Sequence, residues 1–295
     1  MLKEIIKATK NPRLLLSWIL SKISPLLSDK SYIKIQYWLK NKYWLNFDAP
    51  KTFNEKLNWL KLNDRNPQYS LLADKYEVKK IVADKIGAEY VVPCYGVWDK
   101  FEDIDFDSLP EAFVLKANHD SSGATICKDK SKIDKQLLSQ KFKKLLSRNY
   151  FWHLREWPYK NIKPRIIAEK LLEDSSGGRL RDYKFWCFNG EPLYMYCTVK
   201  GGDVYENFFD MNFNPVDVSH GFRRLDPEPT KPHNFELMKQ LAAQLSSGIP
   251  FVRIDFFEVN EEVYFGEYTF YDWGGMKAFK SFEHELELGK YIKIK

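Results

Sequence analysis

The sequence predicts an α+β fold, with antiparallel strand pairs late in the chain. One observation is the pair Asn189-Gly190, the strongest short signal for a two-residue β-turn, which lies between the strand-like segments 182–188 and 192–199. Another is a second strand pair over 251–270, preceded by a segment, 235–245, whose apolar residues recur at helical spacing. Hairpins beside helices, without regular strand–helix alternation, are typical of the α+β class.

Local signals define the elements before this region. Thr52 and Glu55 form a capping-box pattern that predicts the start of a helix. A second helix is predicted over 74–86 and ends at Gly87. An extended segment begins at Val91. The remaining elements are three short strand-like runs and one helix: strands 112–116, 125–127 and 165–170, and helix 137–146.

Composition limits the class of protein. The chain has 295 residues, which is enough for one large or two modest domains. Hydrophobic residues make up 44% of it and charged residues 29%. This balance excludes a disordered tail, a collagen-like repeat and a polytopic membrane protein. The four cysteines form no C-x-x-C pair, so we expect reduced thiols in a cytoplasmic protein.

The basic charge is concentrated at the N-terminus. Residues 1–60 hold eleven Lys and Arg against four Asp and Glu, whereas the rest of the chain holds 35 against 36. No nucleic-acid motif accompanies these dispersed charges, and we expect no nucleic-acid partner. The apolar stretch 14–27 is interrupted by Lys22 and Pro25 and is shorter than the about 20 residues that a membrane span needs. A helix packed on the body is the favoured interpretation; a basic amphipathic helix on an anionic membrane surface is the alternative.

The final strand pair carries polar residues that a buried sheet does not need. Arg253 and Asp255 alternate with apolar residues and share one face, as do Glu267 and Thr269 on the partner strand. A three-residue loop, 260–262, would place Asp255 opposite Glu267 and Arg253 opposite Thr269, whereas a two-residue loop would put the carboxylates on opposite faces. Facing carboxylates repel unless a cation lies between them, and with a hydroxyl they suit Mg²⁺. An exposed face on which Arg253 and Thr269 solvate the acids is an equally weighted alternative.

A lysine followed by small residues suggests phosphate binding. Lys116 ends a strand, and Ser121-Ser122-Gly123 follow within seven residues. Small residues let backbone N–H groups approach a phosphate, and the lysine adds a charge. The loop lacks the G-x-x-x-x-G-K-[ST] pattern, however, and ordinary turns have a similar composition.

Two further acidic motifs have competing interpretations. Asp182 and Lys184 share one face of a strand, either as a surface salt bridge or with the lysine directed at a phosphoryl group. Asp103 and Asp105 match the D-x-D of nucleotide-sugar transferases, although their acidic loop favours a solvated turn. The histidines show no metal-ligand spacing and no G-x-S-x-G is present, which disfavours zinc sites and Ser-His-Asp hydrolysis.

The order of these motifs is more specific than any one of them. A strand lysine, a small-residue loop, a strand ending in Glu-Lys, a D-x-K strand and an R-x-D strand are followed by G-E-x-T. The stretches concerned are 52–60, 72–76, 113–119, 155–157, 165–170, 182–185, 188–191, 253–256 and 264–269. Together they resemble the ATP-grasp superfamily, and within it the TupA-like group found with cell-surface polysaccharide genes. The resemblance covers about residues 45–275.

The resemblance implies two α+β lobes that grip ATP behind an N-terminal helical extension. The expected regions are a basic helical extension, a region before the grasp fold, the small lobe, and the large lobe with a Mg²⁺-binding hairpin: 1–50, 51–110, 111–170 and 171–295.

It also implies roles for individual residues. ATP would be bound by a lysine and a loop at the phosphates, by backbone groups at the adenine and by a carboxylate near the ribose. The residues implied for these contacts are Lys116, Ser121, Ser122, Gly123, Glu169, Lys170, Leu172 and Glu173. The implied catalytic residues, at the γ-phosphate and the forming acyl phosphate, are Lys184 and Arg253. The implied ligands of Mg²⁺ are Asp255, Glu267 and Thr269. Two departures from the family pattern are Thr269, where Asn is common, and Asp120 in a glycine-poor loop.

The implied function is an ATP- and Mg²⁺-dependent carboxylate–amine ligase that forms an amide through an acyl phosphate. The resemblance implies an amino acid or other amine as one partner and a uronic-acid-containing saccharide or glycolipid as the other. Residues 1–45 would provide peripheral contact with the inner face of the membrane. Two alternatives stay open: a glycosyltransferase that uses Asp103 and Asp105, and a non-catalytic scaffold that binds polymer or membrane.

Overall fold

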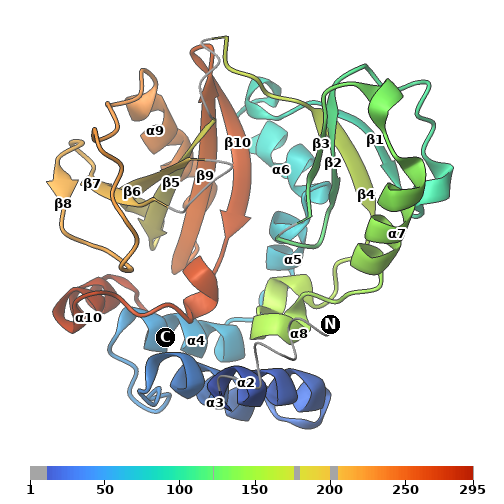
Figure 1. Cartoon of the computed structure of the whole chain (residues 1–295). Coiled ribbons are helices and arrows are strands. Elements are labelled where there is room, and N and C mark those ends of the chain that lie inside the picture. The colour runs from blue at the N-terminus through green and yellow to red at the C-terminus, as the bar shows by residue number, and fades with distance from the viewer. Residues whose placement is uncertain (1–11, 122, 176–179, 200–204, 295) are drawn as a thin grey trace.

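The computed structural model describes residues 12–121, 123–175, 180–199 and 205–294 (Figure 1). Its strands form two antiparallel sheets, with strand orders β1-β4-β2-β3 and β10-β9-β5-β6-β7-β8. The sheets belong to two lobes that face each other across the middle of Figure 1, and helices lie beneath both. The predicted α+β class is therefore confirmed.

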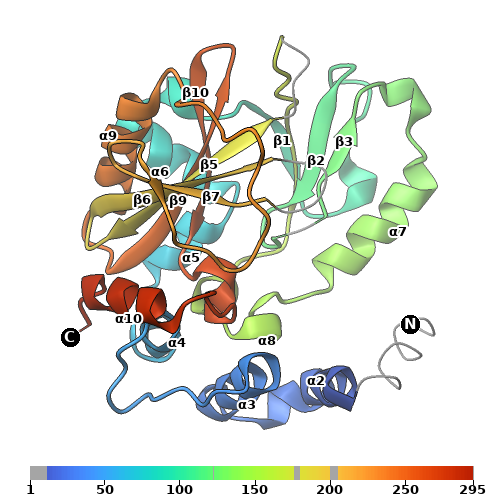
Figure 2. The ribbon, with the colours of Figure 1, turned by 60° about the vertical axis from the view of Figure 1, so that its left-hand side comes forward.

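The N-terminal helices lie at the base of the molecule in both views (Figures 1 and 2). They are α2 (Pro12–Ile23) and α3 (Asp29–Asn41), joined by the short helix η1 (Ser24–Leu26). Tyr32 of α3 donates to the carbonyl oxygen of His153 at 2.9 Å, and Asp29 pairs with the buried Arg155 at 3.0 Å. These contacts show that α3 packs on the body. Within the described ranges, no helix is long and apolar enough to span a bilayer.

Three helices connect this base to the lobes: α4 (Phe53–Asn63), α5 (Gln68–Ala73) and α6 (Glu77–Ile86). The capping box of Thr52 and Glu55 forms at the start of α4, as predicted. The helix predicted over 74–86 begins later, because the Asp74 carboxylate accepts from the backbone N–H groups of Tyr76 and Glu77 and interrupts the chain between α5 and α6. Gly87 ends α6 with a φ of 123°.

The small sheet contains β1 (Cys94–Trp98), β2 (Phe113–Ala117), β3 (Thr125–Cys127) and β4 (Ile166–Lys170). One face packs against α7 (Lys135–Leu146), where Phe113 and Leu115 join Phe142 in a buried cluster. The other face, which carries Lys116 and Glu169, turns toward the large lobe. β1 lies before residue 111, so this sheet includes a strand from the region that the sequence assigns to 51–110.

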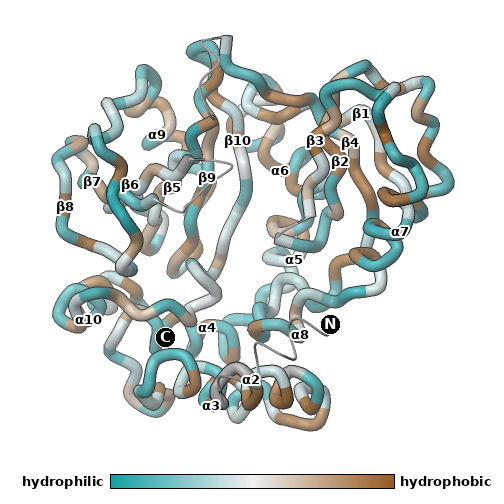
Figure 3. Tube along the Cα trace, viewed as in Figure 1, coloured by the Kyte–Doolittle hydropathy of each residue, from teal (hydrophilic) through white to brown (hydrophobic). Residues whose placement is uncertain are grey.

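The large sheet contains six strands: β5 (Arg181–Phe188), β6 (Glu191–Val199), β7 (Asn207–Asp210), β8 (Pro215–Val216), β9 (Phe251–Val259) and β10 (Glu262–Thr269). Helix α9 (Phe235–Ser246) covers one face, and α10 (Phe282–Tyr291) packs against α4 near the C-terminus. The hairpin of β5 and β6 turns at Asn189-Gly190, as predicted. Figure 3 shows hydrophobic residues along the strands, and the main core includes the fully buried Trp186 and Phe256.

The hairpin of β9 and β10 corrects the predicted loop while keeping the predicted pairs. Asp255 lies opposite Glu267 and Arg253 opposite Thr269, as expected. The turn has two residues, however, because Val259 pairs with Glu262. A β-bulge between Phe265 and Glu267 supplies the extra residue. The prediction that a two-residue loop separates the carboxylates is therefore wrong, because it assumes unbroken alternation along β10.

Candidate active site

The facing surfaces of the two lobes enclose two adjoining cavities of about 190 Å³ and about 230 Å³. The first is mainly apolar, and most of the residues that line the second are charged or polar. Lys75, Lys116, Phe257 and Gly266 line both, so one elongated ligand can occupy the two together. A cleft with an apolar end and a few converging charges is the usual form of a small-molecule site.

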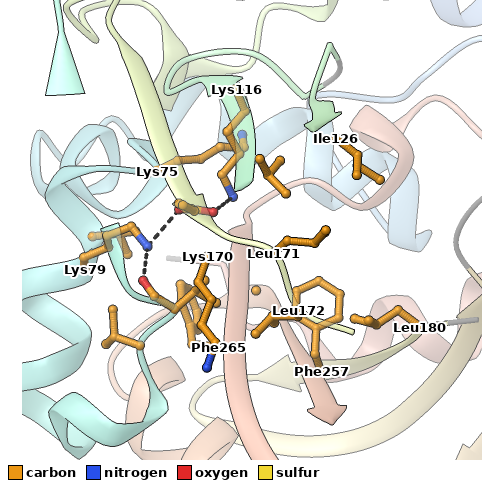
Figure 4. Close-up of a pocket in the computed structure, with 16 residues that line it drawn as sticks. Lys75, Lys79, Lys116, Ile126, Lys170, Leu171, Leu172, Leu180, Phe257 and Phe265 are labelled. Atoms are coloured by element: carbon orange, nitrogen blue, oxygen red, sulfur yellow. Dashed lines mark hydrogen bonds and ion pairs between the residues drawn. The ribbon is translucent and has the colours of Figure 1, made fainter. Parts of the chain in front are cut away.

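The apolar cavity lies beside the chain segment that leaves β4. It is lined by Lys170, Leu171, Leu172, Leu180 and Phe257. Figure 4 shows Leu172, Leu180 and Phe257 on one side of the cavity and Lys75, Lys79 and Lys116 on the other. The Lys170 N–H already donates to the Pro93 carbonyl oxygen at 2.9 Å. That N–H is therefore engaged within the protein.

Glu169 connects two lysines at the boundary of the cavities. Its carboxylate pairs with Lys79 at 2.8 Å and closely with Lys116, as the dashed lines in Figure 4 show. Burial alone raises the pKa of Glu169, but Lys116 and Lys79 outweigh burial and hold that pKa below its ordinary value. Glu169 is therefore an ionised residue that orients Lys116.

Three lysines reach the polar cavity from different elements: Lys75 from the segment between α5 and α6, Lys116 from β2 and Lys184 from β5. Lys75 donates to the Asp120 carbonyl oxygen at 2.6 Å. The pKa of Lys75 is lowered, because burial and the nearby Lys116 together outweigh the opposing effect of Glu267. Such a cluster of cations favours a ligand with several negative charges.

The loop after β2 forms one wall of the polar cavity. Asn118 fixes its start, donating to the Asp74 carboxylate at 2.9 Å and accepting from the Arg165 N–H at 2.7 Å. Ser121 and Gly123 line the cavity, and Gly123 has a φ of 99°, a backbone conformation that favours glycine. Ser122, which the resemblance places at the phosphates, lies outside the described residues.

The charged groups of the large sheet form a network on one face. Lys184 Nζ lies 2.6 Å from Asp255 Oδ2, and the Arg253 guanidinium donates to both Asp255 oxygens at 2.6 and 2.7 Å. Arg253 also donates to Glu267 at 3.1 Å and to the buried Asp272 at 2.5 Å. Burial opposes the charge on Lys184, but Asp255 outweighs burial and raises the Lys184 pKa. Both cations are therefore charged at neutral pH.

Asp255 and Glu267 fit a divalent cation held jointly with a ligand. Their carboxylates line the same cavity from paired positions, and the Thr269 hydroxyl donates to Glu267 Oε1 at 3.1 Å. No group of three or more His, Cys, Asp or Glu side chains in the described ranges is arranged to hold a metal. Two carboxylates are what Mg²⁺ uses when phosphate oxygens and water complete its shell.

Some predicted residues lie outside this arrangement. Glu173 is exposed and pairs with Lys128 at 2.8 Å, and it lines neither cavity. Thr269 and Arg253 do not line a cavity either, although both contact Glu267, which does. Asp103 and Asp105 are exposed around the short helix η3 (Phe101–Asp103), and neither lines a cavity.

Three functional candidates were not predicted: Lys75, Lys79 and Asp272. Lys75 lies in the stretch 72–76 that carries part of the family resemblance, so a signal for it existed. The other two had no distinguishing local pattern, because their partners Glu169 and Arg253 are distant in sequence.

Comparison with known proteins identifies a matching family model. The TupA-like ATPgrasp family model matches residues 55–293. The D-alanine–D-alanine ligase of Bacillus anthracis is 16% identical, with a TM-score of 0.41, over 68% of this chain and 57% of that chain. The corresponding ligase of Helicobacter pylori is 16% identical, with a TM-score of 0.46, over 82% and 69%. The ATP-grasp ligase PsnB, complexed with a phosphomimetic variant of its minimal precursor, Mg and ADP, is 10% identical, with a TM-score of 0.41, over 81% and 65%.

The chain thus spans a little over half of the length of the Bacillus anthracis ligase. No curated protein matches it in sequence at a significant level.

Proposed function

The chain belongs to the TupA-like ATP-grasp family, and we propose that it is an ATP- and Mg²⁺-dependent carboxylate–amine ligase. One observation carries the proposal. Both lobes contribute lysines to one polar cavity, which also holds two facing carboxylates and adjoins an apolar cavity beside the connection between the lobes. A purine with a triphosphate has this same sequence of apolar and anionic parts.

ATP binds along the two cavities. The adenine occupies the apolar cavity between Leu172 and Phe257, and the triphosphate extends past Lys116 into the polar cavity. Lys75 and Lys116 neutralise phosphate charge, while the loop of Ser121 and Gly123 provides small groups that permit close approach. Lys184 lines the polar cavity, and Arg253 contacts the same Asp255 carboxylate as Lys184, so both cations would lie near the transferred phosphoryl group.

Asp255 and Glu267 hold Mg²⁺, and Thr269 orients the Glu267 carboxylate. When bound, the ion offsets the charge of the phosphate oxygens and polarises them toward attack. Asp255 also keeps Lys184 charged and Arg253 fixed in place, so the same carboxylate organises the cations of the site.

The chemistry requires two transfers. A carboxylate oxygen of the acceptor attacks the γ-phosphorus, the bond from that phosphorus to the bridging oxygen breaks, and ADP leaves. The amine nitrogen then attacks the acyl carbon, the C–N bond forms, phosphate leaves with the C–O bond electrons, and the nitrogen loses a proton. Lys184 and Arg253 stabilise the negative charge on the phosphoryl oxygens in both steps. A nucleophilic Ser or Cys is not needed.

The acceptor carboxylate is a uronic acid of a surface saccharide or glycolipid, and the amine is an amino acid or another small amine. This part of the proposal is supported by the family alone. Peripheral contact with the inner face of the membrane would bring such a lipid-linked acceptor to the enzyme. It is supported by α2 and η1, where Leu16, Ile19, Ile23 and Leu26 are exposed beside basic residues, and Figure 3 shows this hydrophobic stretch at the base.

The test is hydroxylamine trapping. An acyl phosphate reacts with hydroxylamine to give a hydroxamate, so the protein with ATP, Mg²⁺ and a panel of uronic acids and amino acids should form hydroxamate and ADP in equal amounts. Lys184→Met and Arg253→Met should abolish the product, whereas Glu173→Gln, an exposed residue outside the cavities, should not. ADP release without hydroxamate from any carboxylate would contradict the proposal.

A further inference from the structure

The turn that follows β10 displays a tryptophan in an unusual backbone conformation. Trp273 has a φ of 49°, and the next two residues, Gly274 and Gly275, have φ values of 62° and 60°. A bulky residue rarely adopts this left-handed conformation, and it persists only where its surroundings impose it.

Buried side chains hold this turn from below. Lys61 donates to the Gly274 carbonyl oxygen at 2.5 Å, and Asn58 donates to the Gly275 carbonyl oxygen at 2.6 Å. A Cβ at Gly274 would lie only 2.4 Å from Leu154. The backbone is therefore fixed between α4 and α8 (Phe151–Leu154), and the Trp273 side chain is left 37% exposed.

A second aromatic residue lies beside Trp273. The ring of Phe222 is centred 4.8 Å from that of Trp273, with 31° between the planes. Phe222 comes from the segment after β8, which is anchored by His220: Glu206 accepts from the His220 N–H at 2.9 Å and lies 2.8 Å from its Nδ1. The two rings thus form a preformed surface, held by buried groups on both sides.

This surface adjoins the proposed reaction centre. Asp272, which directly precedes Trp273, accepts from the catalytic Arg253 at 2.5 Å. His220, which lies two residues before Phe222, packs against Trp186, which shares one face of β5 with Lys184. These contacts connect both aromatic residues to the strands that carry Lys184 and Arg253.

The two segments that carry these rings are basic. Segments 219–225 and 272–280 hold four Lys and Arg residues and one acid, Asp272, whose charge is paired with Arg253. Lys277 Nζ lies 4.5 Å from the centre of the Phe222 ring. Because Lys277 lies over the Phe222 ring, the exposed Trp273 ring supplies the apolar face on which the C–H groups of a sugar can stack, and the lysine beside it can pair with the carboxylate of that sugar.

We propose that Trp273, supported by Phe222 and with Lys277 beside it, binds the sugar ring of an acidic saccharide acceptor and directs its carboxylate toward Arg253. This inference rests on the proposed function, because it assigns the acceptor subsite of the same ligase. Trp273 and Phe222 provide apolar contact area and orient the sugar ring, and Lys277 favours acidic over neutral sugars. The atoms that react are not on these side chains.

The test uses D-glucuronic acid and D-glucose as probes in saturation-transfer NMR with the full chain, Mg²⁺ and ADP. Ring protons of glucuronic acid should receive saturation from the wild type. Trp273→Ala should weaken glucuronic acid binding about tenfold, and Trp273→Phe should restore most of it. Lys277→Gln should reduce the preference for glucuronic acid over glucose. The matched control is Trp44→Ala, a tryptophan that is 53% exposed and stacks on Trp38 near the N-terminal helices.

Thermal shift by ADP and Mg²⁺ on the same samples separates the two proposals. If Trp273→Ala keeps the nucleotide shift and loses glucuronic acid, the acceptor subsite is supported and the fold of the variant is intact. If the wild type shows the nucleotide shift but binds no glucuronic acid, or if Trp273→Ala binds it as well as the wild type, the acceptor subsite is wrong. Loss of the nucleotide shift in the wild type would instead reject the ligase itself.

Discussion

Asp255 of β9 lies opposite Glu267 of β10 because a β-bulge at Gly266 shifts the pairing of the two strands by one residue. Gly266 lines both cavities and packs closely: a Cβ there would lie 3.1 Å from the Asp255 carbonyl oxygen and 3.2 Å from the Phe257 ring. One glycine thus connects the carboxylate pair to the aromatic wall of the apolar cavity.

Replacing Gly266 should disturb nucleotide binding more than folding. In Gly266→Ala the new methyl group displaces the Asp255 backbone or the Phe257 ring, so we expect about tenfold weaker ATP binding, measured by calorimetry. Gly248→Ala is the control, because Gly248 has open space around it but a φ of 79°, so it costs stability away from the cleft. Equal ATP affinity in Gly266→Ala and the wild type would contradict the assignment of the two cavities.

The bulge also shows the limit of sequence patterns. The alternation of polar and apolar residues predicts both strands and the pairing of Asp255 with Glu267. It does not predict the extra residue in β10, where Gly266 packs closely against Phe257. Local signals succeed where the structure is local, as at Asn189-Gly190 and at the capping box before α4.

Long-range contacts account for the rest. Asp272 is buried because it accepts from Arg253 and Tyr196, which come from other strands, and no pattern around Asp272 encodes them. Lys75 resembles a solvated surface lysine in sequence, yet its N–H bond to the Asn118 carbonyl oxygen holds it at the cleft. Asp272 could be identified as a site residue only once the strands were placed together, whereas the stretch 72–76 had already marked the neighbourhood of Lys75.

Asp272 should act as a positioning residue for Arg253. The Asp272→Asn change removes the charge that holds the guanidinium at 2.5 Å, so we expect kcat for hydroxamate formation to fall about tenfold while the affinity for ATP changes little. Steady-state kinetics with ATP titrated separates the two parameters. As a control, Asp210→Asn changes a carboxylate that only stabilises the turn after β7. An unchanged kcat in Asp272→Asn would show that Arg253 does not depend on this contact.

Glu169 should give the protein a stabilising contribution that is lost in acid. Its folded pKa lies below its ordinary value, so the contribution is complete above the unfolded pKa and disappears as the pH falls through the folded one. Glu169→Gln should therefore lower the melting temperature at pH 7, and the difference from wild type should shrink below about pH 4. Melting curves from pH 3 to 8 measure this.

Glu173→Gln serves as the reference for that series, because Glu173 forms an exposed pair with Lys128 and should show little effect at any pH. If the difference in melting temperature between Glu169→Gln and the wild type stayed constant down to pH 3, Lys79 and Lys116 would not be holding the Glu169 pKa below its ordinary value.

The exposed face of α2 should bind anionic membranes. Vesicle flotation should recover the protein with phosphatidylglycerol-containing vesicles, less so with neutral phosphatidylcholine or at high salt. Replacing Leu16, Ile19 and Ile23 by Ser should abolish recovery, whereas Ser at Leu71 and Leu137, which are also exposed but lie in α5 and α7, should not. Equal flotation of both sets would remove α2 as the membrane contact.

The central claim is a Mg²⁺-dependent ATP site organised by Asp255, and thermal shift tests it most directly. The wild type, Asp255→Asn and the Asp103→Ala/Asp105→Ala double variant would be melted with Mg²⁺ and ATP, ADP, GTP, UDP-glucose or UDP-glucuronic acid. A ligand that binds only the folded state must raise the melting temperature. We predict a rise with ATP and ADP that requires Mg²⁺, persists in the double variant and is lost in Asp255→Asn. A rise with a UDP-sugar alone, kept in Asp255→Asn and lost in the double variant, would contradict the ligase and favour a glycosyltransferase.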